Sequence, residues 1–173
     1  ILKLNVEKSY FSPRLSTERK RIFLQVKTGE SVLVMFSGIG VYPIVIAKNT
    51  GAKEIYGIEI NPIAHKYALG NLKLNKIGAK IKLYLGDAKK ILPKIVKKFD
   101  RIIMPPPKGA EDYLDSALNK IKNKGTIHFY SFCEENQYEN IKKIINEECQ
   151  KNKKKCRIFN IVKFTRDWFA NGN

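Results

Sequence analysis

The chain has 173 residues, of which 43% are hydrophobic, so it fits one domain with a substantial core, and its apolar runs are too short and too charged for a membrane span. Lysine and arginine total 33 against 16 acidic residues, which gives a formal net charge of +17. Because such an excess repels itself unless a polyanion screens it, the composition predicts a nucleic-acid partner; the alternative, a thermophile composition, usually raises glutamate together with lysine.

Strand-like and helix-like stretches alternate along the chain. The strand-like runs are continuous stretches of Val, Ile, Tyr and Phe, which is typical of parallel strands covered on both faces. Pro43 and Pro62 suit the first turn of a helix, where a missing N–H costs nothing. This pattern predicts an open, doubly wound, mostly parallel α/β sheet with helices on both faces. The predicted strands are residues 31–36, 54–60, 80–85, 101–104, 125–132 and 156–164, and the predicted helices are residues 43–49, 62–74, 88–98, 111–122 and 134–150.

Residues that can bind a ligand follow the predicted strands, where doubly wound sheets form their sites. After the first strand comes Phe36-Ser37-Gly38-Ile39-Gly40, whose glycines allow a sharp turn and a close approach of a ligand. Glu59 ends the second strand about 20 residues later, the separation of an acid that binds ribose hydroxyls. Asp87 follows the third strand and either caps the next helix or binds an adenine amino group. Taken together, these positions predict an adenosine ligand.

Two adenosine cofactors fit such a sheet, NAD and S-adenosylmethionine. The NAD fingerprint requires a third small residue at the start of the helix after the glycines. Here the positions after Gly40 are Val41-Tyr42-Pro43, so the third small residue is missing. Because S-adenosylmethionine has no phosphate to bind, the sequence favours S-adenosylmethionine.

Seven motifs follow one another along the chain: YFSPRLSTER at 10–19, MFSGIG at 35–40, IEINP at 58–62, NLKLNK at 71–76, GDA at 86–88, DRIIMPPPK at 100–108 and GTIHFY at 125–130. In these motifs the chain resembles the class I S-adenosylmethionine-dependent transferases of Rossmann-like fold, and more narrowly the archaeal and eukaryotic family that modifies guanosine 37 of tRNA. One branch of that family is the tRNA guanine-37 N1-methyltransferase. The other is the wybutosine-pathway enzyme that transfers a 3-amino-3-carboxypropyl group. The resemblance implies a cytoplasmic enzyme with S-adenosylmethionine as group donor and the tRNA anticodon loop as partner.

The resemblance also implies how the chain is divided. Residues 1–30 would close over the methionine end of the cofactor, residues 31–173 would form the catalytic domain, and a further tRNA-binding part would precede Ile1. Glu59 would bind the ribose, and Asp87 with Ala88 the adenine. RNA would be bound by Arg14 and Lys108. The full set of implied cofactor-binding residues is Phe11, Ser12, Arg14, Arg19, Phe36, Ser37, Gly38, Gly40, Glu59, Ile60, Asn61, Asp87, Ala88 and Pro105.

The informative departure from the family is Pro105-Pro106-Pro107, where the N1-methyltransferase branch usually has Asn-Leu-Pro. That Asn helps to aim the methyl group at N1, but Pro105 has neither a side-chain amide nor an N–H. Since catalysis depends on placing the reacting atoms, the change favours aminocarboxypropyl transfer to C7 of 4-demethylwyosine in tRNA-Phe, for wybutosine-derivative synthesis. The alternatives are the guanine-37 N1-methyltransferase, a small-molecule or protein methyltransferase, and a non-catalytic RNA-binding module that has kept the fold.

Three residues are assigned to catalysis through the resemblance: Glu18, Tyr10 and Pro107. Glu18 aligns with the family's proton acceptor, but it could instead only pair with Arg14 or Arg21 at helical spacing. Tyr10 could stack on an aromatic ring of the substrate or simply fill the core. Pro107 completes the stiff segment that would orient the sulfonium of the cofactor.

The cysteines and histidines suggest no metal site. Cys133, Cys149 and Cys156 are isolated, so neither a disulfide nor a zinc site is expected, and a reducing cytosol is the simplest compartment. His128 lies inside an apolar, strand-like run, which is typical of a core histidine with satisfied hydrogen bonds. The sequence does not fix an oligomeric state, and we expect a monomer.

Overall fold

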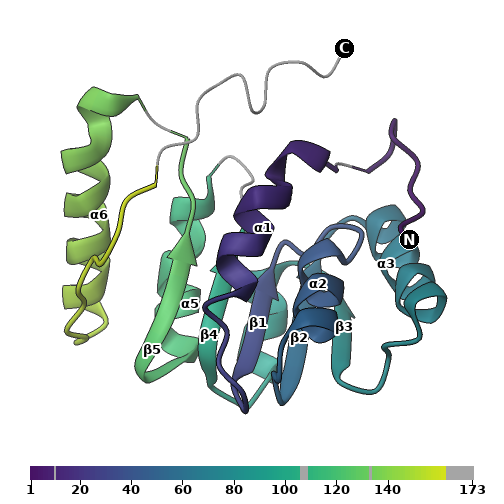
Figure 1. Ribbon diagram of the computed structural model, residues 1–173. Helices are drawn as coiled ribbons and strands as arrows, with labels where there is room; N and C mark the ends of the chain where they lie inside the picture. The colour runs from purple at the N-terminus through teal and green to yellow at the C-terminus, as the bar shows by residue number, and fades with distance from the viewer. Residues whose placement is uncertain (10, 106–108, 133, 163–173) are drawn as a thin grey trace.

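Five parallel strands form one twisted sheet in the order β3-β2-β1-β4-β5 (Figure 1). The computed structural model describes residues 1–9, 11–105, 109–132 and 134–162. The direction of strand order reverses between β1 and β4, so the open sheet has a topological switch point there. The strands are β1 (Ser31–Met35), β2 (Glu54–Glu59), β3 (Ile81–Leu85), β4 (Phe99–Met104) and β5 (Ile121–Phe129).

Helices connect the strands and cover both faces of the sheet. Local sequence sets their starts: the Asn61 side chain accepts hydrogen bonds from the first turn of α3, with Pro62 directly after it, and Asp87 caps α4 in the same way. None of the helices in the described ranges is long and apolar enough to cross a membrane. The α-helices are α1 (Ser16–Phe23), α2 (Val41–Asn49), α3 (Pro62–Asn75), α4 (Ala88–Ile91), α5 (Leu114–Lys120) and α6 (Tyr138–Lys151), and the 3₁₀ turns are η1 (Pro13–Leu15), η2 (Leu92–Lys94), η3 (Ala110–Tyr113) and η4 (Glu135–Gln137).

Side chains of the central strands alternate between two hydrophobic cores. Val32 and Val34 of β1 pack with α1, α2 and α3, whereas Leu33 and Met35 pack with α4, α5 and α6. All four are completely buried. Because successive side chains point to opposite faces, a strand buried on both sides must be continuously apolar. The predicted doubly wound α/β architecture is therefore confirmed.

Three expectations about the C-terminal part were wrong. The helix predicted for residues 111–122 ends at Lys120, because Ile121 already pairs with Phe99 as the first residue of β5. The strand predicted for residues 156–164 is absent in its described part, 156–162, and residues 163–164 lie outside the described residues. Cys149 and Cys156, expected to be free, form a disulfide. The disulfide ties the start of this segment to the end of α6.

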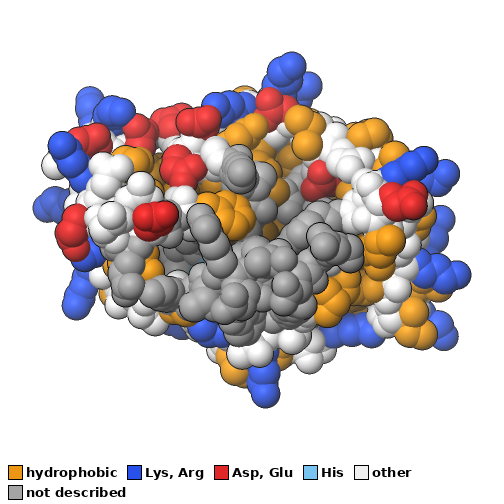
Figure 2. Space-filling view, turned by 90° about the horizontal axis from the view of Figure 1, so that it is seen from above, with side chains coloured by type: hydrophobic (Ala, Val, Ile, Leu, Met, Phe, Trp, Pro, Cys, Tyr) orange, Lys and Arg blue, Asp and Glu red, His pale blue; other side chains and the backbone are white. Residues whose placement is uncertain are grey.

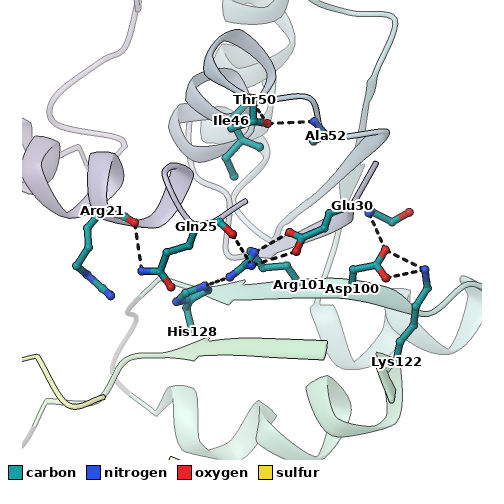
Figure 3. A network of polar contacts seen from close by, with 11 residues as sticks. Arg21, Gln25, Glu30, Ile46, Thr50, Ala52, Asp100, Arg101, Lys122 and His128 are labelled. Atoms are coloured by element: carbon teal, nitrogen blue, oxygen red, sulfur yellow. Dashed lines mark hydrogen bonds and ion pairs between the residues drawn. The ribbon is translucent and has the colours of Figure 1, made fainter. Parts of the chain in front are cut away.

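A buried polar network joins the start of β1 to β4 and β5 (Figure 3). Arg101 is 4% exposed and forms a two-pronged ion pair with Glu30, with N···O distances of 2.8 and 3.1 Å. Its guanidinium also donates to the carbonyl oxygen of Gln25 at 2.6 Å and to Nε2 of His128 at 2.7 Å. Because a guanidinium can only donate, the His128 ring accepts at Nε2 and is neutral. The prediction that His128 is a core histidine with satisfied hydrogen bonds is confirmed.

The protonation of His128 makes stability depend on pH. Burial, together with the nearby positive charge of Arg101, lowers the pKa of His128 from 6.5 to about 3. The unfolded chain therefore takes up this proton first, and stability present above pH 6.5 is lost as the pH falls towards 3. In His128→Gln the side-chain oxygen can still accept from Arg101, but the group that titrates is gone. Between pH 7.5 and 5 we therefore expect the unfolding free energy of the wild type to fall by about 2 kcal/mol more than that of the variant. Urea unfolding at each pH measures this, and parallel pH profiles for the two proteins would contradict it.

Candidate active site

The loop after β1 turns sharply at the carboxyl edge of the sheet. The Ser37 N–H donates to the carbonyl oxygen of Ile58 in β2 at 2.8 Å, and the Gly40 N–H donates back to that of Ser37 at 3.0 Å. Gly38 and Gly40 have φ angles of 55° and 86°, as this turn requires. Phe36 also has a positive φ, 57°, which is strained for a residue with a side chain and is a common feature of binding sites.

The two glycines of this loop serve different purposes. A Cβ added at Gly40 would lie 3.2 Å from the Cβ of Ala68, so Gly40 allows helix α3 to approach the loop. The structure thus gives Gly40 a packing role, and its predicted contact with a cofactor stays a prediction. Gly38 instead donates its N–H to a carboxylate oxygen, and this contact organises the site.

Glu59, at the end of β2, is held by two backbone donors. Its Oε2 accepts from the Gly38 N–H at 2.7 Å, and its Oε1 accepts from the Asn61 N–H at 2.8 Å. The residue is 9% exposed. A carboxylate has about four lone-pair positions, so the two backbone bonds fix its orientation and leave two positions for donors such as ribose hydroxyls. Ile60, which follows, is 63% exposed, and Asn61 caps α3.

An aromatic cluster surrounds the ends of β1 and β3. The edge of Tyr113 packs on Phe36 with ring centroids 4.9 Å apart, and the Lys89 ammonium lies 4.8 Å from the centroid of the Tyr113 ring. Asp87 caps α4 through the Lys89 N–H at 2.9 Å, and the next residue, Ala88, is buried. Burial, followed by the charge and hydrogen bonding of Asp87, raises the pKa of Tyr113. The cluster offers aromatic surface and a carboxylate side by side, which suits a purine.

The residues directly before α1 are held against that helix by Arg19. Arg19, 8% exposed, donates to the backbone carbonyl oxygens of Ser12 and Pro13 at 3.0 and 3.4 Å, and its guanidinium carbon lies 5.3 Å from the centroid of the Phe11 ring. Arg19 thus holds Phe11 and Ser12 in place. Arg14 lies in η1, but its side chain is outside what the structure describes.

Glu18 is the centre of a buried polar cluster. Its carboxylate, 1% exposed, accepts two bonds from the Arg21 guanidinium at 2.6 and 2.7 Å and a third from the Tyr130 hydroxyl. The Tyr42 and Tyr130 hydroxyls lie 3.5 Å apart. The bond to Glu18 raises the pKa of Arg21, and burial raises the pKa of both tyrosines. The predicted pairing of Glu18 with Arg21 at helical spacing is therefore confirmed.

The predicted residues that lie after β4 are only partly described. Pro105 directly follows β4, beside β1 at the switch point of the sheet, and is half-buried. Pro107, Lys108 and Tyr10 lie outside the described residues. Seen from the carboxyl edge, apolar side chains and some acidic ones lie within the described part of this face, while Lys and Arg side chains, with further acidic ones between them, lie around its rim (Figure 2). Of the predicted site residues that are described, Gly38, Glu59 and Asn61 are joined directly by hydrogen bonds.

Sequence reasoning missed three tyrosines that shape the site. Tyr113 falls within the helix predicted for residues 111–122 and was given no role in the site, yet it packs on Phe36 and interacts with Asp87. Tyr42 and Tyr130 were not singled out. Tyr130 lies inside the strand predicted for residues 125–132, whereas β5 ends at Phe129, and its partner Glu18 lies 112 residues away, so no local signal marked it.

Comparison with known proteins identifies the family. A model of the TRM5/TYW2 methyltransferase domain matches residues 1–159. The chain belongs to this family. The predicted resemblance and the class I S-adenosylmethionine-dependent fold are confirmed.

Both branches of the family occur among the relatives. The chain is 45% identical over 131 residues to tRNA (guanine(37)-N(1))-methyltransferase Trm5b of Pyrococcus abyssi, covering 76% of this chain and 38% of that protein. It is 36% identical over 130 residues to tRNA(Phe) (4-demethylwyosine(37)-C(7)) aminocarboxypropyltransferase of Methanocaldococcus jannaschii, covering 75% of this chain and 51% of that protein. Other relatives are named as methyltransferases of 4-demethylwyosine. The chain therefore spans between a third and two thirds of the length of these curated relatives.

A solved structure supports the same placement. The crystal structure of M. jannaschii TYW2 in complex with AdoMet superposes with a TM-score of 0.78 at 32% identity, covering 87% of this chain and 68% of that one. That structure contains S-adenosylmethionine, which is therefore the compound to test on the site built around Glu59.

Glu59→Ala should weaken binding of S-adenosylmethionine about 10- to 100-fold. The substitution removes the carboxylate that accepts from the Gly38 and Asn61 N–H groups and that would accept from the ribose hydroxyls. Isothermal titration calorimetry measures the affinity. Glu54→Ala is the matched control, since Glu54 begins the same strand at the opposite edge and pairs with Lys97. Equal affinities for the two variants would show that Glu59 is not a ligand-binding acid.

Proposed function

We propose that the chain is the catalytic domain of an S-adenosylmethionine-dependent enzyme that transfers the 3-amino-3-carboxypropyl group to C7 of 4-demethylwyosine at position 37 of tRNA-Phe. Family membership supports a transferase that acts on this tRNA position. The observation that carries the finer assignment is Pro105, which replaces the usual Asn of the N1-methyltransferase branch at the end of β4.

The described residues fit S-adenosylmethionine. Glu59 has two lone-pair positions free for the ribose hydroxyls, and the Phe36–Tyr113 pair beside Asp87 and Ala88 offers a place for adenine. Arg19 holds Phe11 and Ser12, which would face the methionine end. When bound, the cofactor supplies carbon atoms activated by the neighbouring sulfonium. The protein's part is to choose which of these carbons meets the base.

Pro105 lies where that choice would be made. It follows β4 beside the loop after β1, at the switch point where ligands bind in open α/β sheets. Without an amide at this position, nothing at residue 105 would aim the methyl group at N1. The C7 atom of the base would then form its bond to the γ-carbon of the methionine arm while the bond from that carbon to sulfur breaks. The electron pair of the broken carbon–sulfur bond would stay on sulfur, which leaves methylthioadenosine, and the proton from C7 would pass to Glu18.

The product formed on tRNA tests the transfer. With tRNA-Phe that carries 4-demethylwyosine, we expect the modified nucleoside to gain the mass of an aminocarboxypropyl group, and tRNA labelled by the carboxyl carbon of S-adenosylmethionine but not by its methyl carbon. Pro105→Asn should raise methyl transfer relative to aminocarboxypropyl transfer, because it restores an amide beside the base. Methyl label entering either this tRNA or tRNA with unmodified guanosine 37 would instead assign the chain to a methyltransferase.

The role of Glu18 is tested by comparing it with its partner Tyr130. If Glu18 takes the proton, Glu18→Gln should lower kcat about 100-fold or more and remove the acidic limb of the pH–rate profile. Tyr130→Phe removes one hydrogen bond to the same carboxylate but keeps the acid, so it should leave that limb in place. If both variants lose the same activity with an unchanged pH profile, Glu18 only anchors α1.

A further inference from the structure

Residues 1–9, called the strap below, are fastened along helix α3 by asparagines (Figure 1). Asn71, completely buried, accepts from the Lys3 N–H at 2.7 Å and donates to the Lys3 carbonyl oxygen at 3.0 Å. Asn61 donates to the carbonyl oxygen of Lys8 at 3.0 Å, and Asn75 donates to that of the first residue at 2.7 Å. The strap backbone therefore has a fixed position on α3.

A pocket of about 580 Å³, called the strap pocket below, lies between the strap and α3. On the α3 side its wall is made by Ile63, Tyr67, Gly70 and Leu74, which recur at helical spacing. A Cβ built at Gly70 would have nothing within 4 Å, so the wall is open there. Tyr67 is half-buried and presents part of its ring to the pocket. The wall therefore offers an aromatic and apolar surface.

Three lysines, Lys3, Lys8 and Lys66, also line the strap pocket. All three are exposed, and within the described residues none of their ammonium groups forms an ion pair or a hydrogen bond. The strap places two of them on one side of the pocket and α3 places the third on the other. None of the described residues that line the pocket is acidic. The pocket therefore suits an anionic ligand.

We propose that the strap pocket binds a single-stranded stretch of the substrate RNA next to the modified base, with phosphates on the three lysines and a base against Tyr67. Cations beside an aromatic surface are the features with which proteins bind single-stranded nucleic acid. Helix α3 begins at Pro62, three residues after Glu59, so the pocket adjoins the candidate active site. An acidic peptide would use the lysines but not the aromatic wall. The inference rests on the tRNA substrate of the proposed function.

Removing the three lysine charges tests the phosphate contacts. The triple variant Lys3→Gln, Lys8→Gln and Lys66→Gln should lower affinity for the tRNA about tenfold or more, and should reduce the slope of log affinity against log salt by about two. Fluorescence anisotropy with labelled tRNA at several salt concentrations measures both quantities.

A matched control changes the same charge elsewhere. Substituting Gln at three exposed lysines, each directly before a strand at the opposite edge of the sheet, removes the same number of charges at positions that do not line the pocket. We expect the salt slope to change little. The control positions are Lys53, Lys80 and Lys98.

A second variant fills the pocket without changing charge. In Gly70→Leu, leucine is favoured over glycine in a helix, and its Cβ would meet no neighbour within 4 Å. Thermal unfolding should therefore show a variant at least as stable as the wild type. Because its side chain would occupy the place of the base, we expect tRNA affinity to fall about fivefold or more with an unchanged salt slope.

The outcomes separate this inference from the proposed function. If the wild type binds tRNA and both the lysine triple variant and Gly70→Leu bind as tightly, the strap pocket is not an RNA site, although the transferase assignment stands. If the lysine variant and its control lose affinity equally, the charge acts through the whole protein and the pocket is again excluded. If the wild type binds no tRNA at all, the substrate proposal fails and this inference fails with it.

Discussion

The carboxylate of Glu59 connects the parts on which the candidate active site depends. Through Gly38 it fixes the loop after β1, and through Asn61 it fixes the start of α3. Its own backbone carbonyl accepts the N–H of Gly86, the residue before Asp87, which caps α4. One residue at the end of β2 therefore sets the positions of three neighbouring chain segments. Because backbone donors satisfy only half of its acceptor positions, the same group is both a structural centre and available to a ligand.

Two polar clusters place the N-terminal segments on the sheet by side-chain contacts. The strap is tied to α3 by asparagines, whereas α1 is tied to the end of β5 by Glu18 and Tyr130. The end of the strap lies near Glu59, because Asn61, whose N–H donates to Glu59, also donates its side-chain amide to the carbonyl oxygen of Lys8. The charges are divided: the ammonium groups of the lysines that line the strap pocket have no bond to any described residue, while the carboxylates of Glu59 and Asp87 lie at the strand ends. Under the proposed function, this division would let a polyanion bind without competing for the groups that would hold the nucleoside.

The sequence predicted the sheet and the strand-end residues well, because both signals are local. A strand buried on both faces, such as β1, must be apolar throughout, and glycines or an acid directly after a strand stand out against that background. Contacts that join distant positions were not predictable from spacing. The helical pairing of Glu18 with Arg21 was foreseen, but Tyr130, the other partner of Glu18, is 112 residues away, and Glu30, the ion-pair partner of Arg101, is 71 residues away. The disulfide between Cys149 and Cys156 likewise depends on how the segment after α6 folds back, which no periodicity describes.

A structure of the chain with bound S-adenosylmethionine tests the central claim about Glu59 most directly. The account predicts both ribose hydroxyls within hydrogen-bonding distance of the Glu59 carboxylate, while the Gly38 and Asn61 N–H groups keep their bonds to the same two oxygens. A nucleoside bound away from the end of β2, or a Glu59 side chain that leaves Gly38 when the ligand binds, would contradict it.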